Sequence, residues 1–294
     1  MELGKSVGVP ALLCSIRLRI LQGRFWPALG DGGRHREGRK AGREWKGDNG
    51  GMALRITDVS ADAVLLAGGA RAILLQLAVP GVARGVARHS DFADRPLDRL
   101  HGTLTYLYVT VYGTPEEART VARNVGRAHA PVEGASDAGL QLWVAATLYD
   151  TAMQVRELVY GRLPPEDARS LLADYAVVGT ALGVPRADWP DTPTAFAEYW
   201  RSAPLEVGDE ARGVASALLH ATNIPAWMRA LMPTVRLMTA GLLSPELRAA
   251  YGLDFDARKY ARLVRTLRAV YPRLPRRLRE APMRRYLRAF RARG

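Results

Sequence analysis

The chain has 294 residues, 48% of them hydrophobic, which is enough for one large domain or two of ordinary size. Its single cysteine, Cys14, excludes an intramolecular disulfide and a cysteine-based metal cluster, and it fits a reducing, cytoplasmic location. The net charge of +13 is uneven: residues 1–51 have a net charge of +5 and residues 255–294 of +12, which leaves −4 for residues 52–254. A nucleic-acid enzyme is expected to carry a basic stripe across its binding face, so this distribution argues against nucleic acid as a partner.

Residues 1–51 differ in composition from the rest of the chain. They contain eleven glycines, and residues 30–42 have no hydrophobic period. Such a segment cannot bury enough apolar surface to offset the entropy of ordering it, so we predict a disordered extension. The apolar stretch 7–21 contains two arginines and lacks a clear small-residue cleavage site, so we expect no secretory signal. Met52 directly precedes periodic sequence and is an alternative start of translation.

Helix patterns dominate from Ser60 onward, and no alternating run bounded by turns predicts a strand. The patterns favour helices over 61–79, 82–88, 98–112, 114–132, 140–160, 165 to about 183, 194–202, 208–222, 225–243 and 244–251. The tail 256–293 is rich in arginine, and its apolar residues lie at helical spacing, interrupted by Pro272 and Pro275. No segment has the length of a transmembrane helix. We therefore predict an all-α fold, with residues 52–294 as a single large helical domain.

The helix predicted over 114–132 has the clearest start signal. Thr114 supplies an N-cap oxygen, Pro115 fits the first helical position, and Glu117 completes a capping box. His129 lies on the apolar face of this helix, so its imidazole is expected to point inward. An inward imidazole is either a core residue with a satisfied hydrogen bond or a ligand, and the spacing alone does not decide between them.

Several common catalytic motifs are missing from the sequence. It contains no phosphate-binding loop, no dinucleotide fingerprint after a strand and no paired histidines of the H-E-x-x-H type. It also has no nucleophile elbow and no convincing pair of carboxylates for hydrolysis. Hydrolase and transferase interpretations thus lose their usual support, and a cofactor is expected to carry any difficult chemistry.

Separated blocks of the sequence carry a family resemblance. The blocks are residues 68–92, 99–103, 112–118, 127–129, 142–150, 198–200 and 241–247. In this order they resemble the MpaB-type oxygenases, which share their catalytic domain with latex clearing protein, the rubber oxygenase. The resemblance extends over about residues 52–285 and includes the arginine- and proline-rich tail. Agreement of several blocks in order is far more specific than any single motif.

The resemblance implies a globin-like helical arrangement around heme b, with His129 as the proximal ligand of the iron. Arg99 and Thr103 match positions that line the heme pocket, where an arginine can pair with a propionate. Arg71 lies within an apolar helix and needs a carboxylate, for which Asp150 and a heme propionate are the candidates. The predicted cofactor-binding residues are therefore His129, Arg99, Thr103 and Arg71, with His129 binding the metal.

The activity implied by the resemblance is insertion of O2 across a carbon–carbon double bond of a lipophilic, isoprenoid-like substrate. The chain departs from the family pattern at Val79 and Ala145, where histidines are usual, and at Gly126 and Glu133, where arginines are common. The first two changes remove polar groups that would orient oxygen or substrate. They favour the alternative, a non-catalytic helical protein of the same fold that binds a hydrophobic ligand or a membrane surface.

The basic tail has three interpretations. It is a solvated amphipathic segment, a contact with an anionic membrane surface, or a nucleic-acid contact. We expect O2 and a lipophilic small molecule as partners, no nucleic acid, and peripheral membrane contact through the tail as an addition to a cytoplasmic location.

Overall fold

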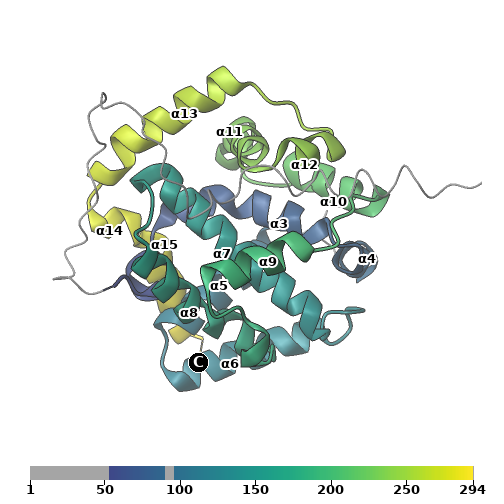
Figure 1. The fold of residues 1–294 in the computed structure, drawn as a ribbon, viewed down its shortest axis with the longest axis vertical. Coiled ribbons are helices and arrows are strands. Elements are labelled where there is room, and N and C mark those ends of the chain that lie inside the picture. Colours follow the sequence, from purple (N-terminus) through teal and green to yellow (C-terminus); the bar gives the residue numbers. More distant parts are fainter. Residues whose placement is uncertain (1–52, 90–95, 294) are drawn as a thin grey trace, which may run out of the picture.

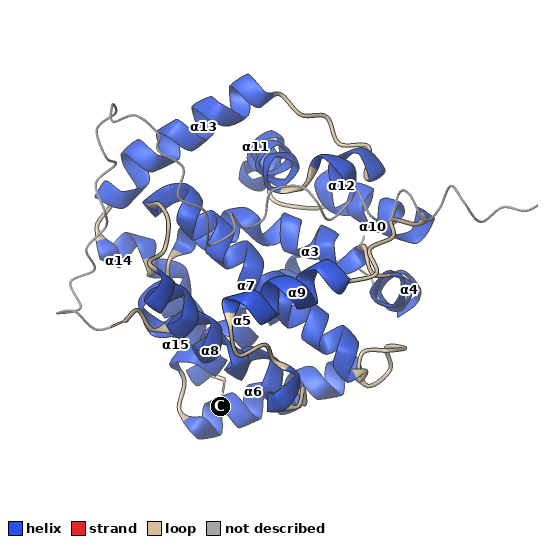
Figure 2. Cartoon of the chain, viewed as in Figure 1, coloured by secondary structure: helices blue, strands red, loops and turns tan. Residues whose placement is uncertain are grey.

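The computed structural model describes residues 53–89 and 96–293, and every regular element in these ranges is a helix (Figure 2). Helices make up 76% of the structure, and the described residues contain no strand, which confirms the all-α prediction. The extension predicted over residues 1–51 lies outside the described part of the chain.

The elements follow one another through short connections. The first half contains α2 (Ile56–Val59), the 3-10 helix η1 (Ala63–Gly68), α3 (Gly69–Leu77), α4 (Pro80–His89), α5 (Pro96–Tyr112), α6 (Pro115–His129), α7 (Ala138–Tyr160) and α8 (Pro165–Thr180). The second half contains η2 (Arg186–Asp188), α9 (Pro193–Ser202), α10 (Asp209–Leu219), α11 (Ala226–Leu242), α12 (Pro245–Ala250), α13 (Ala257–Val270), η3 (Tyr271–Arg273), α14 (Arg276–Arg279) and α15 (Ala281–Arg291).

Helices α3 and α7 cross the middle of the molecule and pack against each other (Figure 1). On one side lie α11 and α13, and on the other α5 packs against α6, α8 and α15. The main hydrophobic core joins these layers, and Leu74 of α3, Val109 of α5 and Leu172 of α8 are fully buried in it. The arrangement places the start of α5 and the end of α6 at the edge of this core.

The segment predicted as one helix over 61–79 is divided into η1 and α3. Asp62 caps η1 by accepting a hydrogen bond from Val64 N, and Gly68 ends it. A Cβ on Gly68 would lie only 2.4 Å from Thr151 Cγ2 of α7, so the two elements meet there at a distance that only glycine permits. The next helix begins at Pro80, earlier than predicted, because proline fits the first turn of a helix.

No single described helix is long and apolar enough to cross a membrane. Ala63–Leu77 and Pro80–Arg88 have the length and apolar composition of a spanning segment only when they are taken together. The two helices are bent by 103° at the break between them.

Candidate functional site

The site predicted from sequence begins at the end of α6. The capping box is confirmed, since Thr114 Oγ1 accepts from Glu117 N at 3.2 Å and a Glu117 carboxylate oxygen accepts from Thr114 N at 2.8 Å. The helix ends at His129, three residues before the predicted end, and the chain turns there as Val132 N donates to His129 O at 2.8 Å. His129 is therefore half-buried in the last turn of α6.

The surroundings of His129 favour a neutral imidazole. Burial lowers the pKa of its ring below the ordinary value of 6.5, and the positive charge of Arg99 lowers it further. A helix C-terminus on its own favours the protonated ring, so burial and Arg99 act in the opposite direction to the helix dipole. The neutral ring is the form that binds metals, and it is the form present here at neutral pH.

Arg99 and Thr103 lie one turn apart on α5 and so share a face of that helix. Neighbouring protein atoms desolvate the Arg99 guanidinium and lower its pKa, although the residue as a whole is exposed. Thr103 is exposed as well. His101, two residues after Arg99, is exposed toward α15, where its ring lies 5.9 Å from that of Tyr286. This separates His101 from the pair formed by Arg99 and His129.

The loop after His129 packs against α4. Arg88 Nη1 forms an ion pair of 3.1 Å with a carboxylate oxygen of Glu133, and both side chains are exposed. A Cβ on Gly85 would lie 2.7 Å from Glu133 O, so α4 approaches this loop closely. Glu133, at a position where the family resemblance leads us to expect an arginine, is thus paired with the basic side chain of Arg88. The sequence did not reveal this contact, because no spacing rule links Arg88 to Glu133.

Arg71 lies in the interior between α3, α7 and α11. It is 3% exposed, and its guanidinium contacts an Asp150 carboxylate oxygen at 2.7 Å, Thr151 Oγ1 at 2.6 Å and Leu242 O at 2.9 Å. Of the two carboxylates considered from sequence, the structure supplies Asp150. The assignment of Arg71 to cofactor binding stays a prediction. A cofactor is not needed to explain how this buried charge is compensated.

Val79 and Ala145, where the family pattern has histidines, are both buried in the main core. Helices α7 and α8 come close at Ala145, since a Cβ on Gly179 would lie 3.4 Å from the Ala145 Cβ. Ala145 is thus part of the contact between these two helices.

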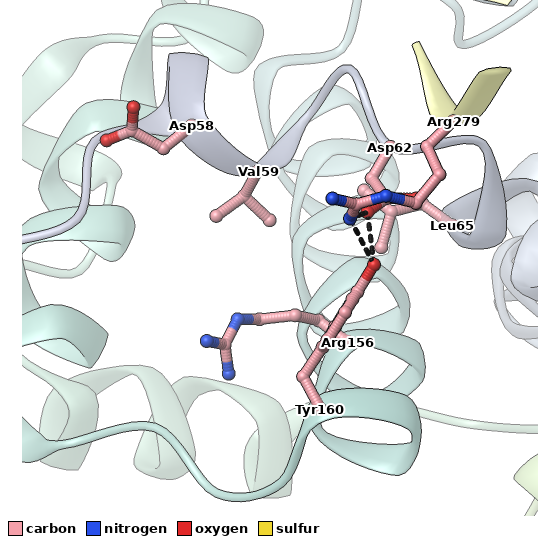
Figure 3. Close-up of a pocket in the computed structure, with 7 residues that line it drawn as sticks. All are labelled: Asp58, Val59, Asp62, Leu65, Arg156, Tyr160 and Arg279. Carbon is pink, nitrogen blue, oxygen red and sulfur yellow. Dashed lines mark hydrogen bonds and ion pairs between the residues drawn. The ribbon is translucent and has the colours of Figure 1, made fainter. Parts of the chain in front are cut away.

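A small cavity lies elsewhere, at the far end of α7 (Figure 3). Its volume is about 40 Å³, and its polar lining comes from Asp58, Asp62, Arg156, Tyr160 and Arg279. This volume suits a few water molecules and is far too small for a porphyrin. Residues 156–160 are separated from the first turn of α7, next to the His129 loop, by most of a helix of roughly 35 Å. The cavity is therefore distinct from the His129 site.

Of the four predicted cofactor residues, the structure brings His129 and Arg99 together, places Thr103 one turn from Arg99, and puts Arg71 beside Asp150. Within residues 53–89 and 96–293 no group of three or more His, Cys, Asp or Glu side chains could hold a metal ion.

These features define an all-α protein in which a half-buried histidine at a helix end lies within electrostatic reach of an arginine from the neighbouring helix. The sequence pattern described as ER-bound oxygenase mpaB/B′/rubber oxygenase, catalytic domain, matches residues 57–270, and the chain belongs to this family. Two uncharacterized proteins, from Mycobacterium bovis and Mycobacterium tuberculosis, are each 33% identical over 228 residues, which cover 70% of this chain and 88% of the relative. No solved structure shows significant similarity to the chain.

Proposed function

We propose that the protein is a heme b-dependent oxygenase that inserts O2 into a lipophilic, unsaturated, isoprenoid-like substrate. Membership of an oxygenase catalytic-domain family supports the reaction class. The observation that carries the cofactor assignment is the half-buried His129, held neutral by burial and by Arg99. One imidazole supplies one ligand, which would suit a cofactor that brings the other metal donors itself.

The side chains at the His129 site suit heme b as the cofactor. His129 offers a lone pair on a neutral ring, and α6 fixes the backbone from which the ring projects. Arg99 offers a cationic guanidinium whose charge reaches that ring, and a guanidinium suits a propionate carboxylate. Thr103, one turn further along α5, offers a hydroxyl on the same face.

When bound, heme iron supplies the oxygen binding and redox chemistry that side chains lack. The protein's own contribution is to hold the ligand ring, to balance the charge of the propionates and to bind the substrate. Val79 and Ala145 are buried in the main core, so their side chains offer no proton donor or acceptor to a bound substrate.

The test uses the full chain, purified and titrated with hemin. We expect a Soret band in the wild type, and its loss in His129→Ala. Arg99→Met is expected to weaken hemin binding by about tenfold, the value of one lost charge-assisted contact. His220→Ala changes the exposed histidine that directly follows α10 and should bind hemin as the wild type does. A colourless protein that takes up no hemin would overturn the proposal.

A second candidate function is a non-catalytic protein of the same fold that binds a hydrophobic ligand. The buried, apolar Val79 and Ala145 favour it. The hemin-loaded protein separates the two functions, since an oxygenase consumes O2 when an unsaturated isoprenoid lipid is added. Hemin binding without O2 consumption across a panel of such lipids would favour the non-catalytic alternative.

A further inference from the structure

The C-terminal segment 271–293 begins where the family match ends, at residue 270. Its inner face packs back onto the domain. Helix α15 lies along α5, and Arg279 of α14 contacts Asp62 at 2.9 Å and Tyr160 at 2.6 Å (Figure 3). Arg291 binds both carboxylate oxygens of Glu117 on α6. The segment is thus a firmly seated part of the structure.

The outer face of the same region is apolar and basic. Val270, Leu274 and Leu278 are 53%, 37% and 61% exposed, although they lie within nine consecutive residues. Arg273 and Arg277 alternate with them and are exposed too. We call these five residues the tail surface. Figure 1 places it at the periphery of the molecule, where α13 leads into α14.

The charged residues in the sequence segment that contains the tail surface are all basic. Residues 257–279 contain nine arginines and lysines and no acidic residue. Residues 52–254 have a net charge of −4, so the net positive charge of the described residues comes from the C-terminal segment of the chain. Among the described residues, Arg273 and Arg277 form no ion pair, in contrast to Arg276, Arg279 and Arg284, which pair with carboxylates.

We propose that the tail surface docks on an anionic lipid bilayer. Aliphatic side chains that project into water gain free energy by entering the acyl boundary, and guanidinium groups beside them meet lipid phosphates at headgroup depth. A nucleic acid would use the arginines but leave the three aliphatic side chains in water. The combination of exposed leucines and arginines therefore favours a bilayer.

The test is co-sedimentation of the full chain with phospholipid vesicles. We expect binding to vesicles rich in phosphatidylglycerol, little binding to phosphatidylcholine alone, and weaker binding as salt is raised. Two double variants, R273E/R277E and L274S/L278S, should each lower the partition coefficient by about tenfold or more. Circular dichroism checks that both variants keep the helical content of the wild type.

Two matched controls exclude general effects. R169E/R201E makes the same change in net charge on α8 and α9, and W227S/L231S removes an exposed apolar pair from α11. Both should bind vesicles as the wild type does. Because every variant keeps residues 1–51 unchanged, a loss confined to the tail-surface variants belongs to that surface.

Three results would overturn the proposal. The first is a wild type that does not bind anionic vesicles. The second is an equal loss in the control and tail-surface variants, which would indicate a non-specific charge effect. The third is tight binding of a DNA duplex that R273E/R277E abolishes and L274S/L278S leaves intact, combined with vesicle binding that L274S/L278S does not weaken. The measurements need no hemin, so they are independent of the proposed oxygenase function.

Discussion

Two effects acting in the same direction distinguish the pKa of the His129 imidazole from that of an ordinary surface histidine. Burial is the larger cause of its lowered pKa, and Arg99 is the smaller one. The ring in the folded protein therefore binds its proton less tightly than the ring in the unfolded chain. Stability from the neutral ring is fully present above the ordinary pKa of 6.5 and is lost as pH falls through the lower, folded value.

The pKa of the His129 ring can be measured in the cofactor-free protein. We expect the His129 ring, followed by NMR and assigned with His129→Gln, to titrate below 6.5. Arg99→Met should move this pKa upward without restoring 6.5, because burial remains after the charge is removed. An unchanged pKa in Arg99→Met would contradict the electrostatic link between the two residues.

The buried pair of Arg71 and Asp150 makes a second residue-scale prediction. Both side chains are almost fully buried and lie 2.7 Å apart, so removing one partner leaves an uncompensated charge in the core. Asp150→Ala should lower the free energy of unfolding in urea by about 3–5 kcal/mol. The double variant R71M/D150L removes both charges and should cost clearly less. Equal losses in the single and double variants would indicate that packing, not charge, dominates at this position.

At the scale of elements, two neighbouring glycines differ in how closely other side chains approach them. A Cβ on Gly68 would lie 2.4 Å from Thr151 Cγ2 and 2.9 Å from Val155 Cγ2, whereas a Cβ on Gly69 would meet nothing within 4 Å. Gly68→Ala should therefore destabilise the protein by about 1–3 kcal/mol in urea unfolding. Gly69→Ala should be neutral or stabilising, by up to about 1 kcal/mol. The expectation fails if the two substitutions have the same effect.

Most helices could be predicted from the sequence because their start signals are local. The caps at Thr114, Thr192 and Ser244 each accept a hydrogen bond from a backbone N–H three residues later. The division between η1 and α3 could not be predicted. It lies at Gly68, where Thr151 of α7, a residue distant in the sequence, approaches closely. The start of η1 is fixed by Asp62, which contacts Tyr160 and Arg279, 98 and 217 positions away. Contacts of this kind leave no periodic trace.

The candidate site was predictable to a similar extent. Helical periodicity placed His129 on an inward face, and the resemblance placed Arg99 near a cofactor. The ion pair of Glu133 with Arg88, and the choice of Asp150 as the partner of Arg71, required the three-dimensional arrangement of three helices and a loop. Local patterns therefore identified the candidate ligand, while tertiary packing determined the charges around it.

At the scale of the whole molecule, one C-terminal helix braces both helices of the candidate site. Helix α15 packs along α5, which carries Arg99, and its Arg291 binds Glu117 at the start of α6, which ends at His129. The contact with Arg291 is the main reason why the pKa of Glu117 falls from 4.5 to about 2. Because the pKa is depressed in the folded state, this stabilisation is present above 4.5 and is lost as pH falls toward 2.

Arg291→Met removes this contact, and we expect its effect on stability to depend on pH. At neutral pH its urea midpoint should lie below that of the wild type, and the gap should narrow as pH falls from 4.5 toward 2, because protonation of Glu117 ends the pairing in the wild type and the variant has no pairing to lose. Arg293→Met, two residues further along an exposed end, should match the wild type throughout. A gap that persists after Glu117 is protonated would mean that Arg291 acts through packing of its side-chain stem rather than through charge. If the brace also positions α5 against α6, hemin affinity in Arg291→Met should fall at neutral pH while His129 and Arg99 remain unaltered.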